Sequence, residues 1–107
     1  MIDKNATESM EQAVCYELRN IIKEHGAFYN SEHEGYAILL EEVEELKESV
    51  DVIQRYLSDL WTNIRNNEIK NINLDGIGNW ARSAAEEAIQ VAAVSEKFLS
   101  SVNKNTL

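Results

Sequence analysis

Three glutamates lie at helical spacing within one short stretch of the chain. Glu41, Glu42 and Glu45 are three and four residues apart, so their carboxylates would gather on one side of a helix. Like charges at this spacing repel one another by roughly 0.2–0.5 kcal/mol per exposed pair. A hard divalent cation such as Mg2+ or Mn2+ would reverse this effect, because it prefers carboxylate oxygens. A solvated acidic face on an amphipathic helix has the same pattern, so these residues alone leave both interpretations open.

A further carboxylate lies near small residues late in the chain. Ala84, Ala88 and Val91 recur at helical spacing, and Glu87 stands beside them. Small side chains let a neighbouring helix come close, which is useful where groups from two helices must reach one site. Glu87 is therefore nearer to the packed side of its helix than a purely solvating glutamate would be. A shared metal site in a helical bundle needs a carboxylate in such a place.

The composition restricts the class of protein. The 107 residues suffice for one domain, which we expect to span residues 1–107 with a core at about 8–102. The absence of proline and the presence of only four glycines favour long helices. A formal charge of −9 argues against a nucleic-acid polymer or an anionic membrane as the partner.

The same composition predicts where the protein acts. No apolar run approaches the ~20 residues that a membrane-spanning helix needs, and the polar N-terminus predicts no signal peptide. The single cysteine, Cys15, excludes an internal disulfide and fits a reducing cytosol. We therefore expect a cytoplasmic protein.

Periodicity and capping residues predict three main helices and hence an all-α fold. The first helix should begin near a capping box at Asn5 or Ser9, after a frayed segment 1–7, and stop at Gly26. A further capping box, which begins at Ser31, predicts the start of the second helix.

The second helix is predicted to be long and to end before a turn. No glycine or proline interrupts residues 36–75, although a break near Ser58 is an alternative. The asparagine-rich stretch that ends in Asp75-Gly76-Ile77-Gly78 predicts the turn. The third helix should run from about Asn79 to Val102. Its predicted seam consists of Ile77, Ala81, Ala84, Ala88, Val91, Ser95, Phe98 and Val102.

Apolar residues repeat every seven positions along the second helix. One series is Tyr36, Val43, Val50, Leu57 and Ile64, and the other is Leu39, Leu46, Ile53 and Leu60. A helix of ~30 residues would be on the order of 45 Å long, too long for one small monomer to cover. We therefore expect a bundle of three main helices that is completed by oligomerisation, as a homodimer or a homotetramer.

Two motifs in this order carry a resemblance to a known family. Glu41-Glu42-Val43-Glu44-Glu45 resembles the EExxE motif of the MazG-like, all-α nucleoside triphosphate pyrophosphohydrolases. In that family an ExxD motif follows on the next core helix, and Glu87-Ala88-Ile89-Gln90 stands in its place. Gln90 is thus a departure, because it offers a neutral oxygen where the family has a carboxylate. The resemblance covers about residues 31–102.

The resemblance implies a Mg2+-dependent enzyme, with Mn2+ as another cation that it would accept. Glu42, Glu45, Glu87 and Gln90 would hold the metal, and Glu41 would act as a further ligand or as a base that positions water. The substrate would be a nucleoside triphosphate, cleaved between the α and β phosphorus atoms to release NMP and pyrophosphate, as in house-cleaning of the nucleotide pool. Candidates for contacts with the phosphates or the base are Lys47, Lys70, Arg82, Trp61 and Trp80.

A different class of function fits the same residues. Gln90 in place of an aspartate also fits a non-catalytic helical module that keeps the MazG-like fold and binds or regulates a partner protein. The paired motifs favour the enzyme, and Gln90 favours the interaction module.

Overall fold

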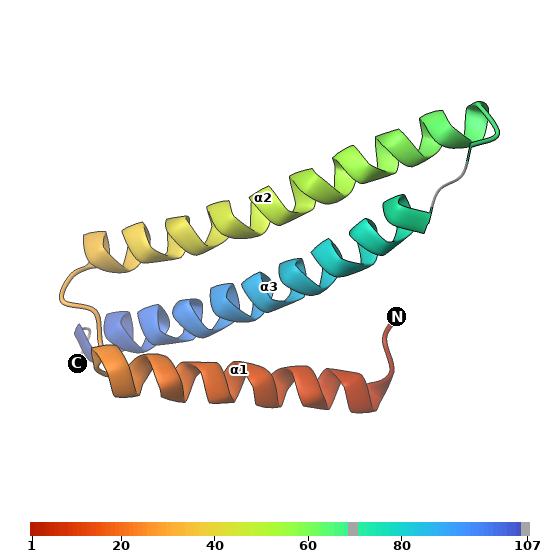
Figure 1. Ribbon diagram of the computed structural model, residues 1–107. Helices are drawn as coiled ribbons and strands as arrows, with labels where there is room; N and C mark the ends of the chain where they lie inside the picture. The colour runs from red at the N-terminus through yellow and green to blue at the C-terminus, as the bar shows by residue number, and fades with distance from the viewer. Residues whose placement is uncertain (69–70, 106–107) are drawn as a thin grey trace.

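Three long helices make up the protein. The structure is a computed structural model that describes residues 1–68 and 71–105, and these form α1 (Lys4–His25), α2 (Glu32–Arg65) and α3 (Asn71–Asn105) (Figure 1). No strand occurs among these residues, so the predicted all-α fold with three main helices is confirmed. None of the described helices is long and apolar enough to cross a membrane.

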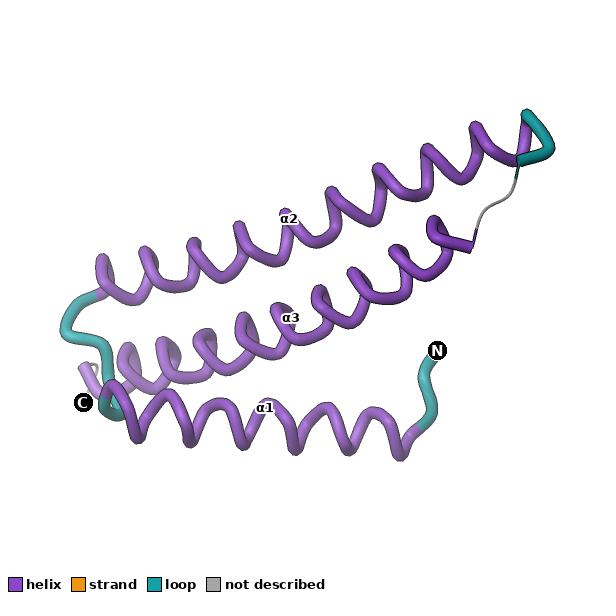
Figure 2. The backbone as a smooth tube through the Cα atoms, in the orientation of Figure 1, coloured by secondary structure: helices purple, strands orange, loops and turns teal. Residues whose placement is uncertain are grey.

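The central helix of the arrangement is α3. It packs against α1 on one side and against α2 on the other, and α1 and α2 form no comparable contact (Figure 2). The helices lie side by side in an elongated molecule of 62 × 32 × 23 Å. Residues of α3 therefore meet side chains from both neighbours, and a site shared between helices has to include α3.

The capping residues define where the first two helices begin and where the first one ends. Asp3 caps α1, because its side chain accepts a hydrogen bond of 2.8 Å from the Asn5 amide. The predicted frayed segment through residue 7 is thus wrong, since the cap lies earlier than either predicted box. The predicted cap at Ser31 is confirmed by its 3.1 Å hydrogen bond from the Glu34 amide. Gly26, with a φ of 89°, ends α1 as predicted.

The predicted turn at Gly76-Ile77-Gly78 is wrong, because these residues lie inside α3. The reason is packing: a Cβ on Gly76 would lie 2.6 Å from Cε1 of Tyr56 on α2, so the glycine makes room for that ring. α2 ends earlier than expected, at Arg65, and it is continuous through Ser58. The glycines therefore allow two helices to approach, and α3 begins well before the predicted Asn79.

The buried line on α3 is displaced from the predicted seam. Ala81, Ala88 and Ser95 of that seam are exposed, whereas Ala93, Val94, Lys97 and Ser101 are buried. The displacement arises because α3 packs on two sides, while the prediction considered one. The start of α2 lies close to the end of α3, because a Cβ on Gly35 would lie 2.8 Å from the Phe98 ring.

Candidate metal centre

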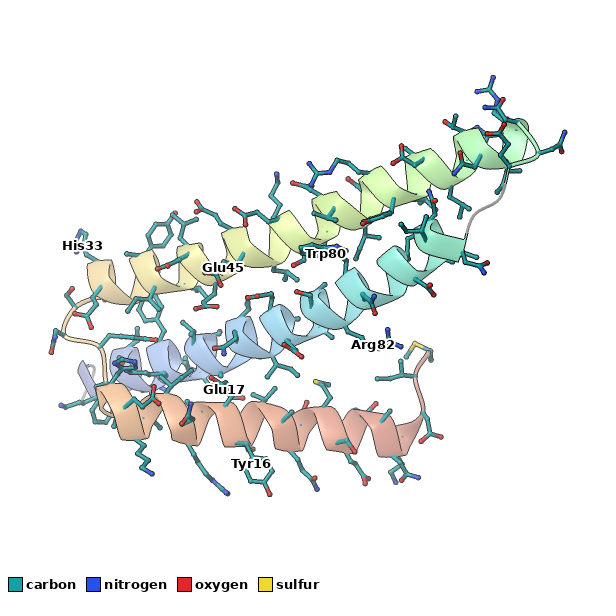
Figure 3. The ribbon with its side chains drawn as sticks, viewed as in Figure 1. Tyr16, Glu17, His33, Glu45, Trp80 and Arg82 are labelled. Atoms are coloured by element: carbon teal, nitrogen blue, oxygen red, sulfur yellow. The ribbon has the colours of Figure 1, made fainter. Side chains whose placement is uncertain are left out.

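Three carboxylates from two helices converge where α2 faces α3. Glu42 and Glu45 of α2 and Glu87 of α3 each offer one oxygen, and these oxygens all lie within 4.8 Å of one another. Figure 3 shows Glu45 on the side of α2 that faces α3. These three residues are hereafter called the carboxylate cluster. The structure thus brings together the three glutamates that the sequence predicted to share a site.

Their helical positions explain why these glutamates meet. Glu42 lies seven residues after Gly35 and seven before Ser49, and both of these are buried. Residues seven apart share one face of a helix, so Glu42 belongs to the face that packs on α3. Glu87 in turn has a half-buried position on α3. The cluster therefore lies at the edge of the helix interface, where its carboxylates are partly exposed to solvent.

The surroundings of the cluster disfavour its ionised form. Burial raises the pKa of the Glu42 carboxyl, and the charges of Glu45, Glu87 and Glu41 raise it further. Burial also raises the pKa of Glu87, as do a hydrogen bond with Glu45 and the charges of nearby glutamates. A cation between these groups would remove the cost of holding them ionised together.

The carboxylate oxygens of the cluster are the ligand type that a hard divalent cation prefers. Mg2+ takes oxygen ligands at about 2.1 Å, so neighbouring ligands in an octahedron are about 3.0 Å apart and opposite ligands about 4.2 Å apart. The carboxylate oxygens lie within 4.8 Å of one another, so side-chain rotations would have to bring them closer together to reach that geometry. Three carboxylates leave room for water or phosphate oxygens in the remaining positions, as Mg2+ sites usually do.

Two other predicted site residues lie outside the cluster. Glu41 is exposed beside Glu42 on α2, and its predicted role as a base stays a prediction. Gln90 points its amide nitrogen toward α1, where it donates a 2.8 Å hydrogen bond to Oε1 of Glu17. Gln90 thus links α3 to α1, and its role as a metal ligand also stays a prediction.

A hollow of about 420 Å³ adjoins the cluster where all three helices meet. Glu42 and Gln90 line it, and so does Lys97, which is only 2% exposed. The Lys97 ammonium lies 4.2 Å from the centroid of the Tyr29 ring. Burial lowers the pKa of Lys97, and the charge of Glu34 opposes this effect. The sequence analysis missed Lys97, although residues 87, 90, 94 and 97 follow one helical face.

A second hollow, of about 410 Å³, lies at the other end of the cluster. Glu45, Glu87, Trp80 and Arg55 are among the residues that line it. Trp80 is 38% exposed, so one part of the indole is available to a ligand. The cluster thus lies between a hollow with a buried ammonium and a hollow with an indole and a guanidinium.

The other candidate contacts lie elsewhere or have local partners. Lys47 forms an exposed ion pair of 3.3 Å with Asp51, and Arg82 donates a 3.4 Å hydrogen bond to Asn79. Trp61 is 59% exposed on α2, and Lys70 lies outside the described residues. Of these predicted candidates, Trp80 is the one that lines a hollow next to the cluster.

Comparison with known proteins gives no further guide to the site. No protein-family model, no curated protein and no solved structure matches this chain. The resemblance to the MazG-like family therefore depends on the EExxE motif, the later Glu87 and the order of the helices.

Proposed function

We propose that the protein is a MazG-like, Mg2+-dependent nucleoside triphosphate pyrophosphohydrolase. The observation that carries the proposal is the convergence of Glu42, Glu45 and Glu87 from α2 and α3, with a hollow at each end. Bound Mg2+ or Mn2+ would neutralise phosphate charge and polarise the phosphoryl group. The chain's own net charge of −9 disfavours binding of a polyanion, and such neutralisation would offset that effect.

The two hollows support a specific placement of the substrate. The base would stack on Trp80 in one hollow, where its flat face can contact the exposed part of the indole. Arg55 in the same hollow would donate hydrogen bonds to a phosphate or to the sugar. Lys97 at the other end would meet the terminal phosphates. The same hollow is lined by Glu17, Glu24, Glu34 and Glu42. A bound cation would therefore be needed there to offset their repulsion of the phosphates.

The proposed reaction adds water across the phosphoanhydride bond between the α and β phosphorus atoms. The triphosphate and one water give NMP and pyrophosphate, and Glu41 accepts a proton from the attacking water. Glu41 is exposed next to Glu42, so solvent can take that proton after each turnover. Glu42, Glu45 and Glu87 hold the cation and keep the phosphates in position. A cytoplasmic location, where nucleoside triphosphates are abundant, belongs to the same proposal. A bundle completed by further copies is a separate proposal, because all three carboxylates of the cluster come from one chain.

One observation favours the second candidate function, a non-catalytic interaction module. The amide of Gln90 is engaged by Glu17, so the residue that replaces the family's aspartate serves to join α1 to α3. In a module of this kind the carboxylate cluster would be a remnant of the fold. The two functions differ in whether nucleotide is consumed.

The experiment is to incubate the protein with ribo- and deoxyribonucleoside triphosphates in Mg2+ or Mn2+ and to identify the products by ion-exchange chromatography. The proposal predicts NMP and pyrophosphate in equal amounts, and no reaction in EDTA. Glu42→Gln and Glu87→Gln should abolish the reaction. Glu44→Gln is the matched control, because Glu44 is an exposed glutamate of α2 outside the cluster.

Two results would contradict the enzyme. Release of NDP and inorganic phosphate would mean that a different bond is cleaved, and activity that survives Glu87→Gln would come from another site or a contaminant. Absence of turnover with all triphosphates and both cations would favour the interaction module.

A further inference from the structure

One face of α2 carries an apolar stripe that no part of the described chain covers. Seven of its large apolar side chains are between 41% and 63% exposed. They are Tyr36, Leu40, Val43, Val50, Leu57, Trp61 and Ile64. They include the whole first heptad series of the helix, so the exposure follows one line along α2. These seven residues are hereafter called the α2 stripe.

The single chain also exposes more surface than a compact protein of its size. Its accessible surface is 8017 Å², whereas a folded monomer of 12.2 kDa is expected to expose about 6,100 Å². The radius of gyration is 17.9 Å, against about 13 Å for a compact chain of this length. The excess is about 1,900 Å² per chain, which sets an upper limit of about 3,800 Å² for the area buried between two chains. This limit lies within the range of obligate homodimers.

We propose that a second copy of the chain covers the α2 stripe, with the two α2 helices antiparallel. The first heptad series is symmetric about Val50, because Val43 and Leu57 lie seven residues from it and Tyr36 and Ile64 lie fourteen. A two-fold axis near Val50 therefore sets Tyr36 of one copy against Ile64 of the other. Such an axis makes the interface self-complementary, as a closed dimer requires.

The charge along α2 favours the antiparallel arrangement over the parallel one. Residues 32–48 carry seven glutamates and one lysine, whereas residues 49–65 carry two aspartates and two arginines. In a parallel pair, the strongly acidic residues 32–48 of one copy would lie against the same residues of the other copy. Antiparallel helices set each acidic half against a half with no net charge, which avoids that repulsion.

The first experiment measures mass in solution. Multi-angle light scattering at micromolar concentration should give a mass of at least two chains, and Val50→Lys should reduce it to one, because two ammonium groups would meet at the axis. Val50 is 41% exposed in the single chain, so this variant should remain helical by circular dichroism. Ser58→Lys is the matched control, since it adds the same charge on an exposed residue of α2 outside the stripe.

The second experiment determines the direction of the helices. In a Cys15→Ser background, a Tyr36→Cys chain mixed with an Ile64→Cys chain should form a disulfide between the two chains. Each variant alone should form none. A disulfide between two Tyr36→Cys chains would overturn the antiparallel arrangement.

Two results would overturn the interface itself. One is a wild-type mass of a single chain at all concentrations up to about 100 µM. The other is a Val50→Lys mass equal to that of the wild type, which would place the contact on another face. Neither result bears on the carboxylate cluster, so this proposal can fail independently of the enzymatic one.

Discussion

Replacing Glu87 by glutamine should stabilise the metal-free protein. Glu87→Gln removes one of three carboxylates whose oxygens lie within 4.8 Å of one another, and it keeps the size and a hydrogen-bonding oxygen. Two unit charges at this distance repel by about 0.9 kcal/mol in water, and by more where water is partly excluded. Glu87 has two such neighbours, but solvent and salt screen the half-exposed cluster, and the amide is still partly buried. We therefore expect a gain of about 1 kcal/mol.

That gain should be visible as a rise in the melting temperature. For a domain of about 100 residues, 1 kcal/mol corresponds to roughly 4–8 °C. The assay is thermal unfolding followed by circular dichroism in EDTA at neutral pH and low salt. Glu44→Gln, which removes one charge outside the cluster, should change the melting temperature by much less. An equal rise in both variants, or no rise in Glu87→Gln, would refute the account of mutual repulsion within the cluster.

Three further predictions concern pH, the glycines of α3 and the buried lysine. Burial and neighbouring charges raise the folded-state pKa of Glu42 and Glu87 above the ordinary value of 4.5. The metal-free protein should therefore gain stability as the pH falls from neutral toward 4.5. Melting curves should show a smaller gain for Glu42→Gln. Gly78→Ala should stabilise the protein by up to about 1 kcal/mol in denaturant titrations, as expected inside a helix, whereas Gly76→Ala should destabilise it through contact with Tyr56. If Gly78→Ala destabilised the protein, α3 would not be helical there. Lys97→Met should leave the melting temperature unchanged or raise it, because it removes a buried charge. The same variant should raise the KM for the triphosphate, and an unchanged KM would exclude contact between Lys97 and the phosphates.

Proton binding and folding are thermodynamically linked, and this linkage determines the direction in which stability changes with pH. A carboxyl with a raised pKa binds its proton more tightly in the folded state than in the unfolded state. The stabilisation from protonation is complete below the unfolded pKa and is lost as the pH rises through the raised, folded pKa. Addition of Mg2+ at neutral pH should compensate for that loss if the cluster binds the ion.

Local signals predict the number of helices, the end of α1, the start of α2 and the place of the cluster. The cap at Ser31 and the stop at Gly26 depend on residues close in sequence, and both were predicted correctly. The spacing of Glu42 and Glu45 and the small residues around Glu87 indicated that carboxylates from two helices would meet. Such features are visible in a sequence because each depends on a periodicity or on neighbouring residues.

Contacts between distant residues explain the features that local signals do not show. The sequence predicts a turn at Gly76, because nothing nearby in the sequence shows that the Tyr56 ring needs its space. The metal-ligand role of Gln90 stays a prediction, and nothing near it in the sequence shows that its amide donates to Glu17, which lies 73 residues away. The sequence does not indicate that Lys97 is buried, because a lysine rarely is and its neighbours come from the segment before α2 and from α2 itself. These three positions depend on how the helices pack, and periodicity does not determine that packing.

The central claim is that Glu42, Glu45 and Glu87 hold a divalent cation, and the most direct test is a titration with Mn2+ in which electron paramagnetic resonance measures the free ion. The account predicts at least one ion bound per wild-type chain and unchanged binding by Glu44→Gln. Loss of an outer-shell partner typically lowers metal affinity by at least about tenfold. Glu42→Gln and Glu87→Gln should each weaken Mn2+ binding by at least that factor. Equal Mn2+ binding by the wild type and all three variants would contradict the claim and identify the cluster as a structural feature of the helix interface.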